Sequence, residues 1–248
     1  MDESDWRNKL SQIETLEEFE ALEPYIEDAE AEDLDYINSP EILRVFIVKY
    51  SIDPVEGFYV TFDNYRIDFF EVFFSFFTLR ELIGSDVIRF SFLLNNVIDV
   101  GAVDVMVFLL DKGLNVDFML DIDEGTGEEP ILSVACGMGR VDIVTLLLQR
   151  EANANLRNFR GETPAFYAIW SGNVSILDHL IVHGANLTLC DEDGSSLWST
   201  TDDLTIMQRL VDMRVPMEDA IVKEIERCLP LSEEKDSLQR ILDTATRR

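Results

Sequence analysis

The residues of this chain whose types and spacing could bind a metal ion are two histidines and a cysteine. His179 and His183 lie four positions apart, which puts both imidazoles on one face of a helix, and Cys190 follows them. His183 directly precedes Gly184, and a histidine at a helix C-terminus is explained by its favourable interaction with the helix dipole. The sequence therefore predicts no metal site and no cofactor.

A second candidate for chemistry is the acidic stretch Asp121–Glu129, which reads DIDEGTGEE and alternates carboxylates as a calcium loop does. It lacks the later bidentate glutamate, so a solvated acidic turn is the better interpretation. Gly125-Thr126-Gly127 is not a phosphate loop, because no Gly-Lys-Ser/Thr ending follows it. Cys136 is explained by packing in a helix. We therefore predict no catalytic residue and no enzyme.

The composition is typical of a folded protein, and its strong negative charge serves either solubility alone or the recognition of a basic partner. Of the 248 residues, 47% are apolar, and 49 acidic against 20 basic side chains give a net charge of -29. Such a surface repels phosphate backbones and anionic lipid heads, so we expect no direct binding to nucleic acid or membrane. The three cysteines have no paired spacing, and no secretory signal is visible. These features favour a reducing, cytoplasmic location.

Internal repetition organises the middle of the chain. The stretches 130–158 and 163–191 align without gaps, with Gly139 over Gly172, and the stretch 92–117 fits the same frame. Gly139 and Gly172 are 33 residues apart, and so are Gly161 and Gly194. This spacing is called the repeat length here. Apolar residues recur at helical spacing, and glycines follow where a helix end needs a left-handed residue. Each unit is expected to form two short antiparallel helices and a projecting turn, and stacking of the units buries their apolar faces.

The start of the 163–191 unit reads Thr163-Pro164, in which the threonine hydroxyl can cap a helix and the proline fits the first helical position. With the 33-residue period, these motifs resemble the ankyrin-repeat family. The resemblance implies an all-α solenoid of about three to five repeats. The chain departs from the family at Phe166, where a histidine is usual, and at Glu151, which replaces a capping glycine. It also has a lengthened turn between Asp117 and Pro130.

Three regions are expected along the chain. Residues 1–90 form an acidic, Phe-rich helical region, in which a buried aromatic core is favoured over a degenerate repeat. Residues 91–216 hold the ankyrin repeats, the last of them shortened, with Trp198 at a core position of its first helix. Residues 217–248 form amphipathic helices that cap the C-terminal end of the array.

The resemblance implies that turn tips and the ends of first helices bind other proteins. Trp170 lies where the scaffold requires no apolar residue, and Val100 and Met138 are assigned to the corresponding place in the two earlier repeats. With Phe159 nearby, they would form an exposed apolar ridge, unless the lengthened turn or a cap covers them. The predicted partner-binding residues are Asp99, Val100, Asp121, Asp123, Glu124, Glu128, Glu129, Met138, Phe159, Arg160, Glu162, Trp170, Ser171, Asp191, Glu192 and Asp193.

The acidic side chains gather at the turns and near the N-terminus. Residues 1–36 hold fourteen acids against two bases, and residues 121–129 hold five acids and no base. We therefore expect a non-catalytic interaction module that binds, and inhibits or shields, a basic protein, as an immunity protein covers a toxin or nuclease. Two alternatives stay open: a dedicated chaperone of a basic nucleic-acid-binding protein, and a structural adaptor linking two proteins, with the N-terminal region as a second docking site.

Overall fold

The structure is a computed structural model that describes residues 3–23, 26, 29–62, 65–121, 127–228 and 235–246. The chain divides into two compact units. The first, called the N-terminal unit here, comprises Met1–Leu93 and Val107–Leu114. The second, called the repeat unit, comprises Leu94–Met106 and Asn115–Arg248.

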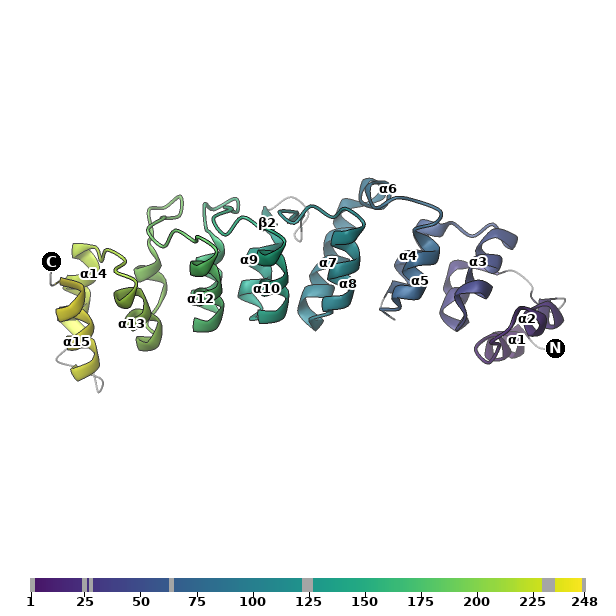
Figure 1. The fold of residues 1–248 in the computed structure, drawn as a ribbon, viewed down its shortest axis with the longest axis horizontal. Helices are drawn as coiled ribbons and strands as arrows, with labels where there is room; N and C mark the ends of the chain where they lie inside the picture. Colours follow the sequence, from purple (N-terminus) through teal and green to yellow (C-terminus); the bar gives the residue numbers. More distant parts are fainter. Residues whose placement is uncertain are drawn as a thin grey trace. The chain divides into compact units, whose positions relative to one another are not determined.

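The N-terminal unit is built from short helices (Figure 1). Its elements are α1 (Glu3–Leu10), α2 (Leu16–Leu22), η2 (Ala31–Tyr36), α3 (Pro40–Lys49), α4 (Pro54–Thr61), α5 (Ile67–Phe73) and α6 (Leu79–Ser85). Helices α7 (Val87–Val100) and α8 (Val103–Asp111) contribute residues to both units. Local sequence explains several helix starts: Thr15 and Glu18 form a reciprocal capping box at α2, and Pro40 occupies the first turn of α3.

An aromatic cluster around Phe58 forms the core of the N-terminal unit. The Phe58 ring is fully buried, and its centroid lies 5.2 Å from that of Phe70 and 5.8 Å from that of Phe73. Phe62 stacks on Phe70 with an interplanar angle of 7°. Gly57 makes this packing possible, because a Cβ atom there would lie 2.6 Å from Cδ1 of Leu34. The expected buried aromatic core is therefore present in this unit.

The repeat unit continues with paired helices and one short hairpin. Its further elements are β1 (Met119–Asp121), β2 (Glu128–Pro130), α9 (Ile131–Gly137), α10 (Val141–Gln149), α11 (Pro164–Trp170), α12 (Val174–Val182), η4 (Leu197–Thr200), α13 (Leu204–Asp212), α14 (Asp219–Cys228) and α15 (Lys235–Thr246). The two strands pair antiparallel, with Leu120 opposite Glu129. The lengthened turn that the sequence predicted therefore folds as a hairpin, while the unit as a whole is helical as expected.

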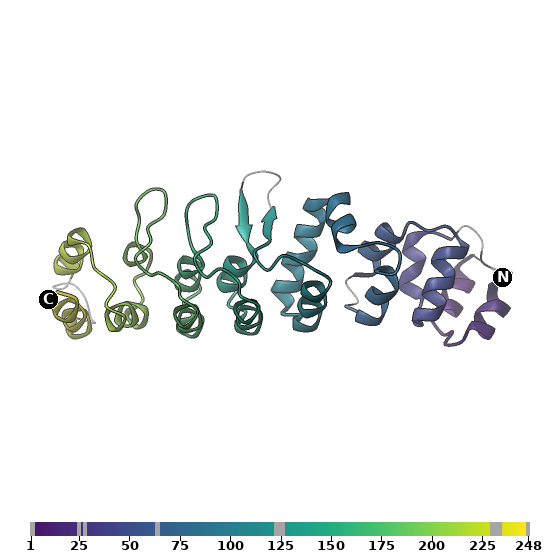
Figure 2. The ribbon, with the colours of Figure 1, turned by 45° about the horizontal axis from the view of Figure 1, so that its top comes forward.

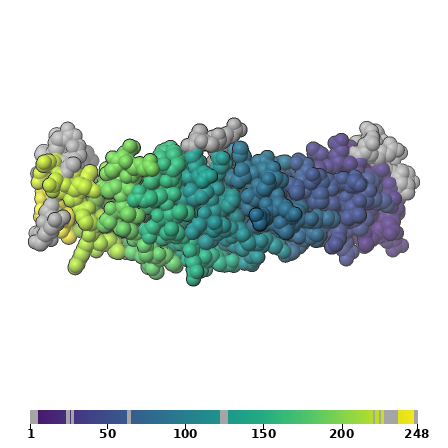
Figure 3. Space-filling model, turned by 90° about the horizontal axis from the view of Figure 1, so that it is seen from above, coloured from purple at the N-terminus to yellow at the C-terminus, as the bar shows by residue number. Residues whose placement is uncertain are grey.

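Successive repeats stack through equivalent residues. Helix α9 packs against α11, and α10 packs against α12. Ile143 and Leu147 of α10 are fully buried, and so are Ile176 and Leu180, which follow them by one repeat length in α12. In Figure 3 the colours of residues 127–228 follow one another in chain order along the surface, as stacking of neighbouring repeats requires.

Two details of the repeat unit test the sequence interpretation of its helix ends and core. Trp198 is 1% exposed and its Nε1 donates to the Pro216 carbonyl at 2.9 Å, so its predicted core position is confirmed. The prediction that the Thr163 hydroxyl caps α11 is wrong, because Thr163 precedes the helix but makes no side-chain cap bond. Its side chain is 1% exposed and serves packing instead. No described helix has both the length and the apolar character that crossing a bilayer requires.

Candidate binding surface of the repeat unit

The loops that connect the repeats project from the same side of the helices as the hairpin (Figure 2). The loop before α11 is closed by Asn158, whose backbone N–H donates to the Glu162 carbonyl at 3.0 Å. Its Oδ1 accepts from the N–H groups of Arg160 and Glu162, both at 2.9 Å. Asp191 closes the next loop in the same way, since its Oδ1 accepts from the Ser195 N–H at 2.7 Å. Asn158 and Asp191 are one repeat length apart, so they are equivalent positions of two repeats.

Neighbouring loops are also tied to each other. The backbone N–H of Glu192 donates to the Arg160 carbonyl at 2.9 Å. Gly161, with φ +77°, lies under Glu192 so closely that a Cβ atom there would be 3.0 Å from the Glu192 nitrogen. On the other side, the Phe159 ring lies against Gly127, which directly precedes β2. The loop tips therefore form one connected edge rather than separate fingers.

A buried polar cluster lies beneath this edge. The Asn158 amide Nδ2 lies 3.1 Å from Oε1 of Glu129, 2.8 Å from Oε2 of Glu162 and 2.9 Å from the Tyr167 hydroxyl oxygen. The Tyr167 hydroxyl in turn donates to Glu129. Burial raises the pKa of Tyr167, and the hydrogen bond to Glu129 raises it further. The hydroxyl therefore stays protonated and acts as a donor at ordinary pH.

The prediction that Glu162 lies exposed on a loop tip is wrong. Its side chain is among the buried ones, with 6% exposure, because the Asn158 amide turns it inward. Glu129 is half-buried for the same reason, whereas Glu128 beside it on β2 is exposed. Glu162 thus serves the loop scaffold and has no free surface for a partner.

Trp170 is exposed as predicted. It is the last residue of α11, and 49% of it is accessible to solvent. Its ring centroid lies 5.1 Å from that of Tyr167 in an edge-on arrangement and 6.3 Å from that of Phe166. The indole is therefore held by two aromatic neighbours while one side faces solvent, an arrangement that suits contact with another protein.

The register of the predicted apolar ridge needs a correction. Gly101, Gly139 and Gly172 all have left-handed φ near +70° at the ends of equivalent helices. Counting back from each glycine, the equivalent of Trp170 is Gly137 in the preceding repeat, and Asp99 takes that place before it. Val100 and Met138 match Ser171 instead. The alignment from sequence matched residues by their apolar character rather than by their distance from the glycine. It therefore placed Val100 and Met138 one residue away from their true equivalents.

The other predicted partner-binding residues have varied environments. Phe159 is 44% exposed, with the Arg160 guanidinium 5.0 Å from its ring centroid, and Val100 is 56% exposed. Met138, Asp121 and Asp191 are half-buried, and Asp191 is engaged in its turn. Asp99 is exposed and pairs with Arg140 at 3.3 Å. The Ser171 hydroxyl donates to the Ala168 carbonyl. Glu192 and Asp193 are exposed on the last tip, while Asp123 and Glu124 lie outside the described residues.

His183 and Cys136 lie in positions that helix structure and packing explain. A ring nitrogen of His183 lies 2.8 Å from the His179 carbonyl at the end of α12. Burial raises the pKa of the Cys136 thiol well above its ordinary value, which keeps it unreactive. Within the described ranges, no group of three or more His, Cys, Asp or Glu side chains is arranged to hold a metal ion. The central residues of the acidic stretch, 122–126, are outside those ranges.

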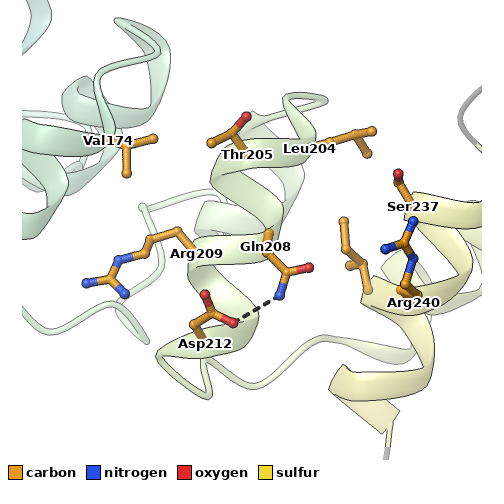
Figure 4. A pocket seen from close by; sticks show the side chains of 9 residues that line it. Val174, Leu204, Thr205, Gln208, Arg209, Asp212, Ser237 and Arg240 are labelled. Atoms are coloured by element: carbon orange, nitrogen blue, oxygen red, sulfur yellow. Dashed lines mark hydrogen bonds between the residues drawn. The ribbon is translucent and has the colours of Figure 1, made fainter.

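A hollow of about 410 Å³ lies between α13 and α15, with Val174 of α12 at its border (Figure 4). Both arginines of its lining have partners: Nε of Arg209 donates to Asp178 at 2.6 Å, and Nε of Arg240 donates to the Asp236 carbonyl at 3.1 Å.

The elements define a helical repeat protein whose loops and first-helix ends carry exposed side chains. Residues 94–191 match the family model of ankyrin repeats in three copies. This segment therefore consists of ankyrin repeats, and the chain is similar to ankyrin-repeat proteins over it. An array of this kind is a protein–protein interaction module.

Proteins of several kinds are similar to this chain over the same short stretch. The inactive serine/threonine-protein kinase TEX14 of Mus musculus is 36% identical over 95 residues, which are 38% of this chain and 6% of the kinase. The ADP-ribosylation factor GTPase-activating protein AGD4 of Arabidopsis thaliana is 29% identical over 98 residues, 40% of this chain and 12% of that protein. The chain thus spans only a small part of these relatives, and the likeness lies in the repeats.

Sequence reasoning did not single out Tyr167, Asn158 or Gly137 as part of this surface. A signal for Asn158 was present, because it precedes Asp191 by one repeat length and both residue types close turns. Tyr167 and Gly137 gave no such signal, since their roles depend on contacts between segments that only the fold brings together.

Proposed function

We propose that the repeat unit binds a basic protein through its loop edge and the exposed face of Trp170. The observation that supports this most directly is a large aromatic side chain, 49% exposed at the end of α11, in a chain of net charge -29. Aromatic residues are enriched at protein interfaces and often act as anchors there. The charge supplies attraction for a cationic surface at a distance, and the aromatic side chain supplies contact area after docking.

The role that fits this pairing best is inhibition or shielding of the partner, in the manner of an immunity protein. A toxin or nuclease that acts on a polyanion has a cationic active surface, which an acidic repeat array complements in charge. A chaperone of a basic nucleic-acid-binding protein would use the same surface, and it differs by releasing its client on assembly. We propose no catalytic step for this chain, because its buried Cys136 and its helix-end His183 have structural explanations.

An adaptor that links two proteins is favoured by a separate observation in the N-terminal unit. Val45 and Val48 lie one turn apart on α3, with exposed fractions of 36% and 63%. Neighbouring exposed valines on one helix face offer a second contact surface to a second partner. We also propose a cytoplasmic location, since the thiols of Cys136 and Cys190 are both free, as in a reducing compartment.

Capture from lysate at low salt, elution by a salt gradient and identification of the bound proteins provide the partner for a kinetic test. We expect Glu128→Gln, Glu192→Gln and Asp193→Asn together to slow association and flatten its salt dependence, with little effect on dissociation. Trp170→Ala should instead weaken binding by about 2 kcal/mol, a roughly thirtyfold change that appears mainly as faster release.

The matched control carries the same change of charge away from the loop edge: Asp104→Asn, Asp142→Asn and Glu218→Gln, all exposed in the repeat unit. If the control slows association as much as the loop variant, the acids act through net charge alone. A partner whose affinity ignores salt and whose dissociation ignores Trp170 would contradict the proposed function.

A further inference from the structure

Gly137 has no side chain at the position where another repeat carries Trp170, so the backbone there is uncovered. It is exposed at the end of α9, at the position that Trp170 occupies in the next repeat. A Cβ atom added at Gly137 would lie 3.1 Å from Cδ1 of Tyr167 and 3.9 Å from its Cβ. The Tyr167 ring therefore lies where a side chain of residue 137 would otherwise extend. Gly137, Tyr167 and Trp170 are called the aromatic patch below.

The two rings of the aromatic patch are held in place from inside. The Tyr167 hydroxyl is fixed by Glu129 and by Asn158, and the edge-on contact at 5.1 Å orients Trp170 against Tyr167. Because rotamers fixed in advance lose less entropy on binding, such rings bind a partner group at a lower cost than mobile ones. The patch is thus a preformed surface, bare on the Gly137 side and about half-exposed at Trp170.

The electrostatics of the aromatic patch favour a cation. The hydroxyl end of Tyr167 meets two carboxylates, Glu129 and Glu162, that share one neutral amide. Within the part of the chain that the structure describes, neither carboxylate makes an ion pair. The basic residues of this side are Arg140, which binds Asp99, Arg160, which lies over Phe159, and Arg157 on the exposed loop. Negative charge at one end of an aromatic surface attracts a cationic side chain that can lie flat on it.

We infer that the aromatic patch is the subsite for an arginine side chain of the basic partner, an inference that rests on the proposed function and names the contact. The arginine stem crosses the bare backbone at Gly137, and the planar guanidinium stacks on Tyr167 and contacts Trp170, whose ring is turned edge-on to that of Tyr167. The guanidinium N–H groups then donate to Glu129. Arginine fits better than lysine, because a guanidinium stacks on aromatic faces and donates to a carboxylate at the same time.

Two synthetic peptides of equal length and charge test the subsite: one alternates glycine with arginine, the other glycine with lysine, and each carries a fluorophore. Fluorescence anisotropy measures their binding to the full chain. We expect the arginine peptide to bind at least about threefold more tightly than the lysine peptide. Tryptophan fluorescence gives a second readout, because Trp170 is exposed while Trp6 and Trp198 are 2% and 1% exposed. The arginine peptide should perturb that emission saturably.

Three variants examine the aromatic patch itself. Gly137→Leu should abolish the preference for arginine by covering Tyr167, and Trp170→Ala and Glu129→Gln should each reduce it. Val182→Leu adds bulk at a residue that is 80% exposed on α12, and Asp142→Asn removes an exposed charge on α10, so both serve as matched controls. They should leave the preference unchanged. Circular dichroism and thermal melts establish that each variant is folded.

The outcomes separate the subsite from the proposed function. Equal, salt-dependent binding of both peptides would overturn the arginine subsite and leave an acidic protein-binding surface intact. An arginine preference that persists in Gly137→Leu and Trp170→Ala would also overturn it, because the selective contact would then lie elsewhere. Absence of binding by either peptide would contradict both the subsite and the proposal of a basic partner.

Discussion

The N-terminal unit and the repeat unit bury their apolar residues in different ways. In the first, one ring, Phe58, touches the rings of Phe62, Phe70, Phe73, Phe74 and Phe77 at centroid distances of 5.2–5.9 Å. In the second, the same positions recur from one repeat to the next, so that Ala135 and Ala168 are both fully buried at the helix contacts. A core centred on one ring depends on how a few side chains fit around that ring. A repeated core instead divides the burial of apolar side chains among equivalent positions of successive repeats.

The comparison also separates function from packing. In the repeat unit, the scaffold positions are filled by equivalent residues, and Trp170 stands out because no scaffold role requires it. In the N-terminal unit, aromatic residues are so frequent that exposure of one, such as Phe92 at 46%, distinguishes it less. An exposed aromatic residue that departs from a repeat pattern is therefore easier to recognise as a candidate binding residue than one in an irregular, Phe-rich unit.

The largest expected effect concerns the two tryptophans of the repeat unit. Trp198→Ala should lower the free energy of unfolding by about 3–5 kcal/mol, because it removes a fully buried aromatic side chain and its hydrogen bond to Pro216. Trp170→Ala should cost less than about 1 kcal/mol, since about half of that residue is already in solvent. Chemical denaturation measures both values. Equal losses would contradict the assignment of Trp198 to the core and Trp170 to the surface.

A second prediction concerns the tight core of the N-terminal unit. Gly57→Ala should destabilise the protein by about 1–3 kcal/mol, because the new methyl group would lie 2.6 Å from Leu34 Cδ1 and 3.1 Å from Phe73 Cε1. Gly84→Ala is the matched control, since nothing lies within 4 Å of its Cβ position. Thermal melts of both variants decide the matter, and a Gly57→Ala protein as stable as the control would show that the aromatic core is loosely packed.

A third prediction exchanges residues between equivalent helix ends of the repeats. Glu151 has φ +67°, and Gly184, which follows it by one repeat length, has φ +85°. Glu151→Gly should raise the free energy of unfolding by up to about 1 kcal/mol, because glycine adopts the left-handed conformation without a Cβ clash. Gly184→Ala should lower it by a similar amount. Denaturation curves for the pair test the repeat alignment, which would be wrong if both changes had the same sign.

The smallest expected effect is the acid sensitivity of two capping boxes in the N-terminal unit. Backbone hydrogen bonds lower the pKa of Glu18, through Glu14 and Thr15, and that of Glu81, through Thr78, below the ordinary value of 4.5. Their contribution to stability is therefore complete above pH 4.5 and is lost as the pH falls through the lowered values.

Hydrogen exchange of α2 and α6 between pH 5 and 3 measures this loss. The variant with Glu18→Gln and Glu81→Gln cannot titrate at these positions, so its exchange should depend less on pH across that range. Identical pH profiles for the variant and the natural chain would mean that the caps do not contribute to acid sensitivity.

The repeats were predictable from sequence because each feature occurs more than once. The constant repeat length, the glycines at helix ends and the buried places of Trp198 and Leu180 all follow from alignment of the chain with itself. The position of Trp170 at the surface followed from the same frame. The alignment did not predict which contacts an individual side chain makes. Thr163 could cap a helix or be buried, and its sequence neighbours do not decide between these environments.

The polar cluster under the loops was less accessible to sequence reasoning. Glu162 is held inward by a hydrogen bond from the Asn158 amide, which also binds Glu129, a residue more than thirty positions earlier in the chain. A repeating sequence pattern does not predict contacts of that kind. The one-residue error in the ridge has a different cause, since Met138 resembles Trp170 in character while Gly137 matches it in position.

Asn158 constrains how this protein can change over evolutionary time. Its oxygen closes a turn, as Asp191 does in the next repeat, but its nitrogen also donates to Glu129, Glu162 and Tyr167. An aspartate at position 158 would close the turn equally well and would bring a third carboxylate against the other two. We therefore expect Asn158→Asp to destabilise the protein less after Glu129 or Glu162 has been replaced than before, so that substitutions at these positions depend on one another.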